Sequence, residues 1–201
     1  MPQSRFWRFF GLLADLFLLN MLWIVGSIPL VTIGASTTAL YYSMIKKWRG
    51  EEGPVIAIFR KSYKQNLGQS TFLWLLIAFA GGDLYLLYRS FGQYRPVQLV
   101  LLLLGFVCLL VALYAFPVVA MLSVSNVQCL QNAFLMAFRH LWASLLMLAV
   151  DGVLLYITFC VFPPLFLLVF GLMAYHNSYF ISRLLTRYTA VESSEMEETG
   201  L

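Results

Sequence analysis

The sequence predicts an all-α, polytopic transmembrane helix bundle. Of its 201 residues, 61% are hydrophobic and only 11% are charged, and the mean hydropathy is +0.82. A water-soluble domain of this length is typically about 45–50% apolar and about 25% charged. The apolar residues also occur in long runs, and about 20 such residues are needed to cross a hydrocarbon core about 30 Å thick. A lipid bilayer is therefore the expected environment of the chain.

The runs predict six transmembrane spans, with five as the alternative. Residues 10–45 are apolar almost throughout but contain Gly26, Pro29 and Gly34. Proline lacks a backbone donor and clashes with the preceding turn, so a helix is expected to break near Ser27–Pro29. This stretch is either a hairpin of two spans or one span plus a long loop. The predicted spans are 9–27, 28–45, 70–88, 97–122, 143–162 and 165–185.

The distribution of Lys and Arg favours six spans with both termini in the cytoplasm. With six spans, eleven of the 13 cationic residues lie on the inner side, and only Arg89 and Arg95 lie outside. With five spans, Arg5 and Arg8 move to the outer side, which weakens the asymmetry that cytoplasmic loops normally show. The inner set comprises Arg5, Arg8, Lys46, Lys47, Arg49, Arg60, Lys61, Lys64, Arg139, Arg183 and Arg187.

The second predicted span and the C-terminal tail differ from the rest. Residues 28–45 are short and rich in Thr, Ser and Gly, which also fits a re-entrant or tilted element packed against protein. Residues 1–188 are expected to form one membrane domain. Residues 189–201 carry four glutamates with little apolar content and are expected to form a flexible acidic tail.

Two segments on the predicted inner side have the pattern of amphipathic helices. We expect these helices to lie in the membrane interface or against a partner. In residues 55–67 the apolar positions at helical spacing are Ile56, Phe59, Tyr63 and Leu67. In residues 126–142 they are Val127, Leu130, Phe134, Phe138 and Leu141. The two segments resemble each other weakly, which suggests that a unit of span, surface helix and span is used twice.

Ionisable side chains within predicted spans are functional candidates, because a charge inside a bilayer is costly. Asp15 is expected to pair with an arginine near the inner interface, and Asp83 to lie in the outer half of its span. Asp151 is deeper and is the better candidate for a polar contact between helices, with His176 or Asn177 as its partner.

The sequence offers no recognisable catalytic, cofactor or metal site. The metalloprotease pattern HExxH, the esterase pattern GxSxG and a phosphate-binding loop are all absent. Cys108, Cys129 and Cys160 share no metal-ligand spacing and are expected to be free thiols. The net charge of +4 does not indicate nucleic-acid binding, because the cations lie between apolar runs instead of forming one basic face. We therefore expect a protein that is not an enzyme.

Residues 19–23 (LNMLW) and 28–41 (IPLVTIGASTTALY) form a distinctive pattern, to which Asn66, Gln69, residues 132–134 (NAF) and Arg139-His140 add. With this pattern the sequence resembles, over nearly its whole length and most specifically in its N-terminal part, the YesL family of bacterial membrane proteins, which is catalogued largely as a domain of unknown function. The resemblance implies a small multi-span protein of Gram-positive bacteria, whose genes often lie beside carbohydrate ABC importers and polysaccharide-degrading enzymes. It supplies no catalytic residues.

These observations lead to two functional hypotheses. In the first, the protein is a non-catalytic accessory subunit of a carbohydrate ABC import system, with ABC transporter permease subunits as partners. In the second, it transports a small solute by itself, with Asp83, Asp151 and His176 as the polar pathway and the broken segment near Ser27–Gly34 as a discontinuous helix. The ligand and the oligomeric state do not follow from the sequence.

Overall fold

The computed structural model describes residues 5–51, 53–122 and 124–199, and within these the side chains other than those of 5, 6, 8 and 185–199. The described chain is helical throughout its regular structure, which confirms the all-α class. The main helices are α1 (Arg5–Gly26), α2 (Ile33–Trp48), α3 (Val55–Phe91), α4 (Arg95–Met121), α5 (Asn126–Arg139), α6 (Leu141–Tyr156) and α7 (Val169–Thr199). Short helical turns occupy Leu30–Thr32, Ile157–Val161 and Pro163–Leu167.

Four helical segments of the described chain are long and apolar enough to cross a membrane, so the protein is a multi-pass membrane protein. They are Phe9–Gly26, Val55–Phe91, Arg95–Met121 and Leu141–Val161. The predicted spans 28–45 and 165–185 are not among them. The first consists of a break and α2, whose 16 residues reach about 24 Å, less than the hydrocarbon thickness. The second begins in the turn Pro163–Leu167 and continues into α7.

Helix α2 lies at the centre of the molecule. This agrees with the alternative that the sequence analysis gave for residues 28–45, an element packed against protein. Ten of its 16 residues are buried, and it contacts α1, α3, α4 and α7. Small residues allow this packing: a side-chain carbon at Gly34 would collide with the backbone oxygen of Ser70 and lie 2.6 Å from Trp74 Cβ. A hydrogen bond of 2.8 Å between Thr38 Oγ1 and Ser70 Oγ joins the same two helices.

Helix α3 is one continuous element of 37 residues, so the predicted helix over 55–67 is present but is the first part of the membrane-spanning helix and not a separate element. This segment contains no proline, and the single Gly68 weakens a helix by only about 1 kcal/mol. Lys64 and Arg89 lie about 38 Å apart along the axis at 1.5 Å per residue. Both cations can therefore lie outside the hydrocarbon core while the same helix crosses it.

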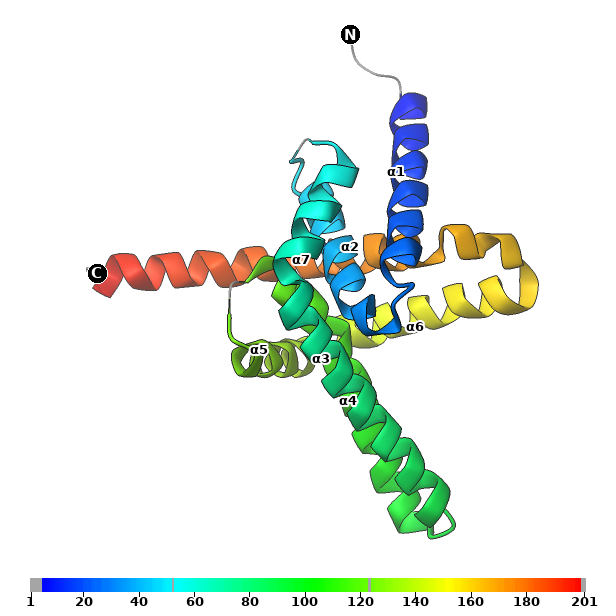
Figure 1. The fold of residues 1–201 in the computed structure, drawn as a ribbon. Coiled ribbons are helices and arrows are strands. Elements are labelled where there is room, and N and C mark those ends of the chain that lie inside the picture. The colour runs from blue at the N-terminus through cyan, green and yellow to red at the C-terminus, as the bar shows by residue number, and fades with distance from the viewer. Residues whose placement is uncertain (1–4, 52, 123, 200–201) are drawn as a thin grey trace.

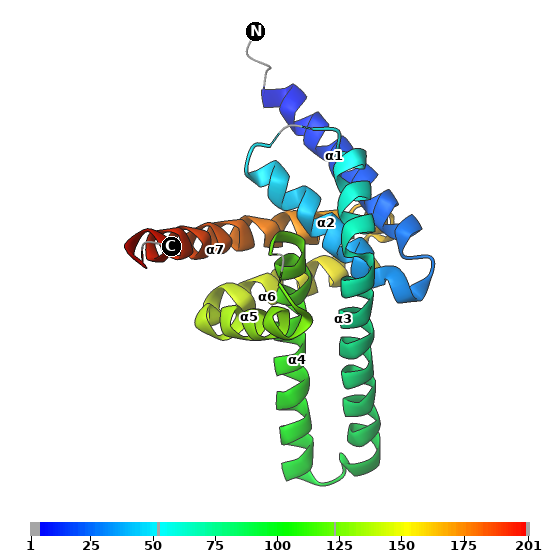
Figure 2. The same cartoon turned by 60° about the vertical axis from the view of Figure 1, so that its left-hand side comes forward.

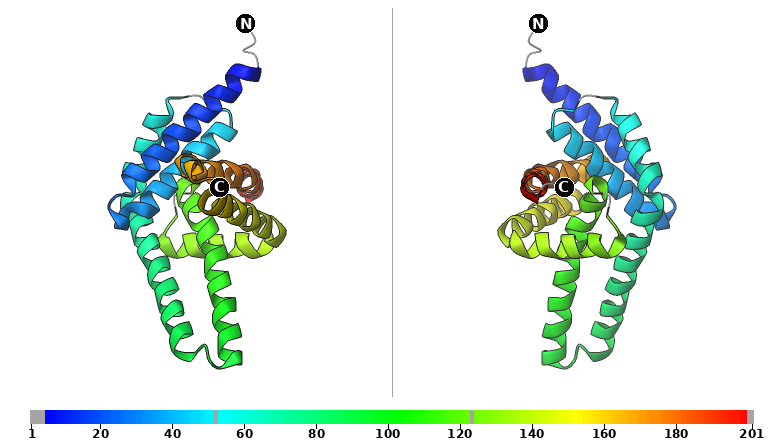
Figure 3. Two further views of the ribbon diagram at one scale, coloured as in Figure 1. Left: turned by 90° about the vertical axis from the view of Figure 1, so that its right-hand side faces the viewer. Right: turned by 90° about the vertical axis from the view of Figure 1, so that its left-hand side faces the viewer.

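The α3–α4 hairpin projects away from the remaining helices (Figure 1). Its two helices run side by side to a short turn, and α6 and the first half of α7 run across their direction (Figure 2). The same crossing is visible in the two side views of Figure 3. The α3–α4 hairpin and the α6–α7 pair therefore cannot both stand perpendicular to one flat bilayer. The backbone of α7 stays helical to Thr199 through most of the segment expected to be a flexible tail.

Helix α5 is amphipathic, as predicted: it packs a face of small side chains against the protein and leaves its large apolar side chains exposed. Its buried face consists of the smaller or more flexible side chains Cys129, Ala133, Met136 and Ala137, which pack α5 against α4. The larger apolar side chains on its other side are exposed: Val127, Phe134, Leu135 and Phe138, followed by Trp142 at the start of α6. Ser125 and Gln128 form a capping box at its N-terminus.

Candidate functional site

A buried polar cluster joins α2, α6 and α7. Asp151 on α6 accepts a hydrogen bond of 2.7 Å from Asn177 Nδ2 on α7, and the same amide nitrogen donates to Tyr41 Oη on α2 at 3.2 Å. Asp151 is 6% exposed and Asn177 is fully buried. This arrangement confirms the predicted contact between Asp151 and Asn177 and adds Tyr41, which the sequence analysis did not single out.

The amide of Asn177 is held by groups on both of its ends. His176 Nδ1 lies 3.2 Å from Asn177 Oδ1, while Nδ2 faces the phenol and the carboxylate. Asp151 Oδ1 is buried and has no hydrogen-bond partner among the described residues. A buried carboxylate with one unsatisfied oxygen is costly when ionised. The cluster can therefore hold a proton on the Asp151 carboxylate, or serve as a hydrogen-bonded contact between helices.

Asp83 is not part of this cluster. It is exposed on the C-terminal third of α3, which belongs to the projecting part of the hairpin (Figure 1). No hydrogen bond or ion pair joins it to another described residue. The predicted pathway of Asp83, Asp151 and His176 is thus divided: the structure brings Asp151 and His176 together around Asn177 and leaves Asp83 apart.

Asp15 forms an ion pair with Lys47 at the end of α2, so its partner is a lysine from another helix and not the expected arginine. The side chain of Arg8, the arginine nearest in sequence, lies outside the described residues. The ion pair joins α1 to α2 and therefore has a structural role.

Asn20 is a second buried polar residue that sequence reasoning missed. Its Nδ2 donates to Phe166 O at 3.1 Å, and its Oδ1 accepts from Gly171 N at 3.1 Å. These bonds satisfy backbone groups at the irregular entry into α7, where helix hydrogen bonds are missing. A lone asparagine inside the apolar run of α1 was the available signal, since such residues commonly form bonds between membrane helices.

Several residues that carry the family resemblance form structural hydrogen bonds, between two helices, between a helix and a connecting segment, or within one helix. Trp23 Nε1 donates to Thr37 Oγ1 at 3.1 Å, Gln69 Nε2 donates to Val124 O at 2.8 Å, and Asn66 Nδ2 bonds within α3 to Ser62 O at 3.0 Å. These contacts explain the residue types by packing and hydrogen bonding.

The three cysteines are free thiols, as expected, and no group of three or more His, Cys, Asp or Glu side chains in the described part of the chain could hold a metal ion. Cys129 is buried and donates a weak hydrogen bond of 3.4 Å to Ala115 O. Burial raises the pKa of the Cys129 thiol to about 11, which makes it a poor nucleophile at neutral pH.

Comparison with known proteins adds one finding. Residues 16–88 match a family model described as "Protein of unknown function, DUF624", which proteins of the YesL family carry. The match extends from α1 to near the end of α3 and includes residues 19–23 and 28–41, on which the resemblance rests. It covers somewhat more than a third of the chain. No curated protein and no solved structure matches the sequence.

Proposed function

We propose that the protein is a non-catalytic accessory subunit of a carbohydrate ABC import system, placed in a bacterial cell membrane with both termini in the cytoplasm. The resemblance to the YesL family supports the connection with carbohydrate import. The predominance of Lys and Arg on the predicted inner side supports the orientation.

The observation that carries an accessory role is the exposed Asp83 on the α3–α4 hairpin. The surrounding hairpin surface is apolar, with Phe79, Leu86, Leu99 and Leu103 all exposed. A charged aspartate costs about 2.5–3.5 kcal/mol at the centre of a membrane helix on insertion scales, and this is an upper bound for Asp83, which lies nearer the outer end of its helix. Gly81 and Gly82 precede it and have open space around them, so another helix can approach closely. A donor on a transmembrane helix of a permease subunit would satisfy the carboxylate.

Affinity capture of the full chain from its native membrane tests this role. The wild-type protein is expected to retain permease subunits of a carbohydrate importer in mild detergent. Asp83→Leu is expected to reduce their yield about tenfold, which corresponds to about 1.4 kcal/mol of binding free energy. The matched control is Asp83→Glu, which keeps the charge and should keep most of the partner.

The subunit proposal fails if the wild-type protein retains no transporter component. The assignment of the hairpin fails if Asp83→Leu captures as much as the wild type. Elution volume and helical circular dichroism of the purified variants show whether a loss of partner reflects a loss of fold.

The buried cluster around Asp151 favours a second candidate, a stand-alone small-solute transporter. Asp151→Asn keeps the shape of the side chain and removes its charge. If the protein transports by itself, proteoliposomes containing it should take up labelled mono- or disaccharides, and this variant should lower the rate at least about tenfold. Uptake that is unchanged in Asp151→Asn removes the carboxylate from the pathway, and an absence of uptake by the wild type favours the accessory role.

A further inference from the structure

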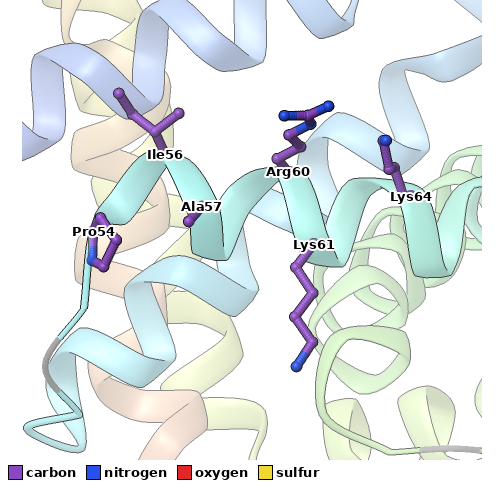
Figure 4. Close-up of a pocket in the computed structure, with 6 residues that line it drawn as sticks. All are labelled: Pro54, Ile56, Ala57, Arg60, Lys61 and Lys64. Carbon is purple, nitrogen blue, oxygen red and sulfur yellow. The ribbon is translucent and has the colours of Figure 1, made fainter.

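A basic depression lies at the start of α3, on the opposite end of that helix from the hairpin turn. It is a shallow, open surface feature of about 480 Å³, lined by Pro54, Ile56, Ala57, Arg60, Lys61 and Lys64. Arg60 and Lys64 extend to one side of the helix and Lys61 to the other, with the apolar residues one to two turns before them (Figure 4). The depression is therefore lined by cations on two sides of α3 and by apolar side chains next to them.

The charges of these three side chains are not matched by nearby carboxylates of the described chain. Lys46 forms an ion pair of 2.6 Å with Glu51, and Lys47 pairs with Asp15. Arg60, Lys61 and Lys64 are all exposed, and none of them is in an ion pair among the described residues. The depression thus has an excess of positive charge that an anionic group can neutralise.

The surroundings of the depression indicate which anion it fits. On α3 itself Ile56 and Leu67 are 51% and 40% exposed. Helix α1 lies close to the start of α3 (Figures 2 and 3), with Tyr63 Oη donating to Gly26 O at 3.3 Å. It exposes large apolar side chains, among them Phe10 and Phe17. A soluble acidic protein surface would leave this apolar area unmatched. A phospholipid has an anionic headgroup for the cations and acyl chains for the apolar side chains.

We infer that the depression formed by Pro54, Ile56, Ala57, Arg60, Lys61 and Lys64 binds the headgroup of an anionic phospholipid. Basic pockets beside membrane helices recognise such headgroups, and each Lys or Arg near an anionic membrane surface strengthens the attraction. The site is independent of the proposed function, because it does not involve the hairpin surface around Asp83.

Native mass spectrometry of the full-length protein tests the site. The protein is purified in mild detergent and mixed with equal amounts of phosphatidylglycerol and phosphatidylcholine. The wild type is expected to retain phosphatidylglycerol in preference to phosphatidylcholine. The variant Arg60→Gln/Lys61→Gln/Lys64→Gln is expected to lower the bound phosphatidylglycerol at least about tenfold, given the contribution of each cation, and to leave phosphatidylcholine unchanged.

Two further variants distinguish a specific site from general charge. Arg89→Gln/Arg95→Gln removes two cations at the hairpin turn and should retain the phosphatidylglycerol. Lys61→Arg/Lys64→Arg keeps the charge in the depression and should retain it as well. Equal retention by the triple glutamine variant and the wild type would overturn the inference. Displacement of the lipid by polyglutamate, but not by added phosphatidylglycerol of another chain length, would also overturn it and indicate an acidic protein partner.

Discussion

Gly34→Ala is expected to lower the free energy of unfolding by about 1–3 kcal/mol, the usual range for an overpacked core. The added carbon would collide with the backbone oxygen of Ser70 and lie 2.6 Å from Trp74 Cβ. Neither atom is the end of a flexible side chain, so α2 and α3 would have to separate. The loss is expected although alanine is the better helix former by about 1 kcal/mol. Thermal unfolding of the purified protein in detergent, followed by tryptophan fluorescence, measures it.

Gly68→Ala is the matched control for this prediction. Gly68 lies in the middle of α3 and has nothing within 4 Å of the position of an added carbon. The same substitution should therefore stabilise the protein slightly, by up to about 1 kcal/mol. If the two substitutions changed the free energy of unfolding by similar amounts, the packing of α2 against α3 at Gly34 would be looser than in the structure.

Asn177→Leu is expected to destabilise the protein by about 3 kcal/mol, at the upper end of the range for leaving a buried polar group without its partner. The variant removes the hydrogen-bond donor to both Asp151 and Tyr41, while the carboxylate stays in an apolar surrounding. The melting temperature in detergent should fall, and the α6–α7 pair should become the first part of the chain to exchange its amide protons.

The double variant Asp151→Leu/Asn177→Leu separates this explanation from a simple loss of packing. Replacing both partners by apolar side chains removes the unsatisfied carboxylate, so the double variant should be more stable than Asn177→Leu alone. Additive losses would mean that the hydrogen bond between Asp151 and Asn177 does not contribute to stability.

Part of the fold follows from the residues alone, because the bilayer imposes a simple rule. Long apolar runs must be helical in order to satisfy their backbone groups in lipid, and this predicted α1, α3, α4 and α6. Pro29 predicted the break before α2, since proline cannot continue the preceding helix. The high cost of a buried charge also made Asp151 a candidate for a polar contact between helices. Its partner, Asn177, was one of the two residues that the sequence analysis proposed from their similar predicted depth in the last span.

The remaining features depend on contacts between residues distant in the sequence. Tyr41 belongs to the cluster only because α2 packs against α7, and no local pattern marks it. Helix α5 buries Cys129 and Ala133 because small side chains let it approach α4, and the sequence analysis had not identified this second, buried face. The separation of Asp83 from Asp151 likewise depends on the way the α6–α7 pair crosses the α3–α4 hairpin.

The sequence by itself determined that this chain is a helical, multi-pass membrane protein. Composition, run length and the positions of proline and charge are sufficient for that, because they act on each segment separately. The tertiary structure decided that α2 is the buried centre, that Asp151 meets Asn177 and Tyr41, and that Asp83 stays exposed. These outcomes depend on which helix faces can approach one another closely, and the small residues that allow such an approach leave no periodic signal in the sequence.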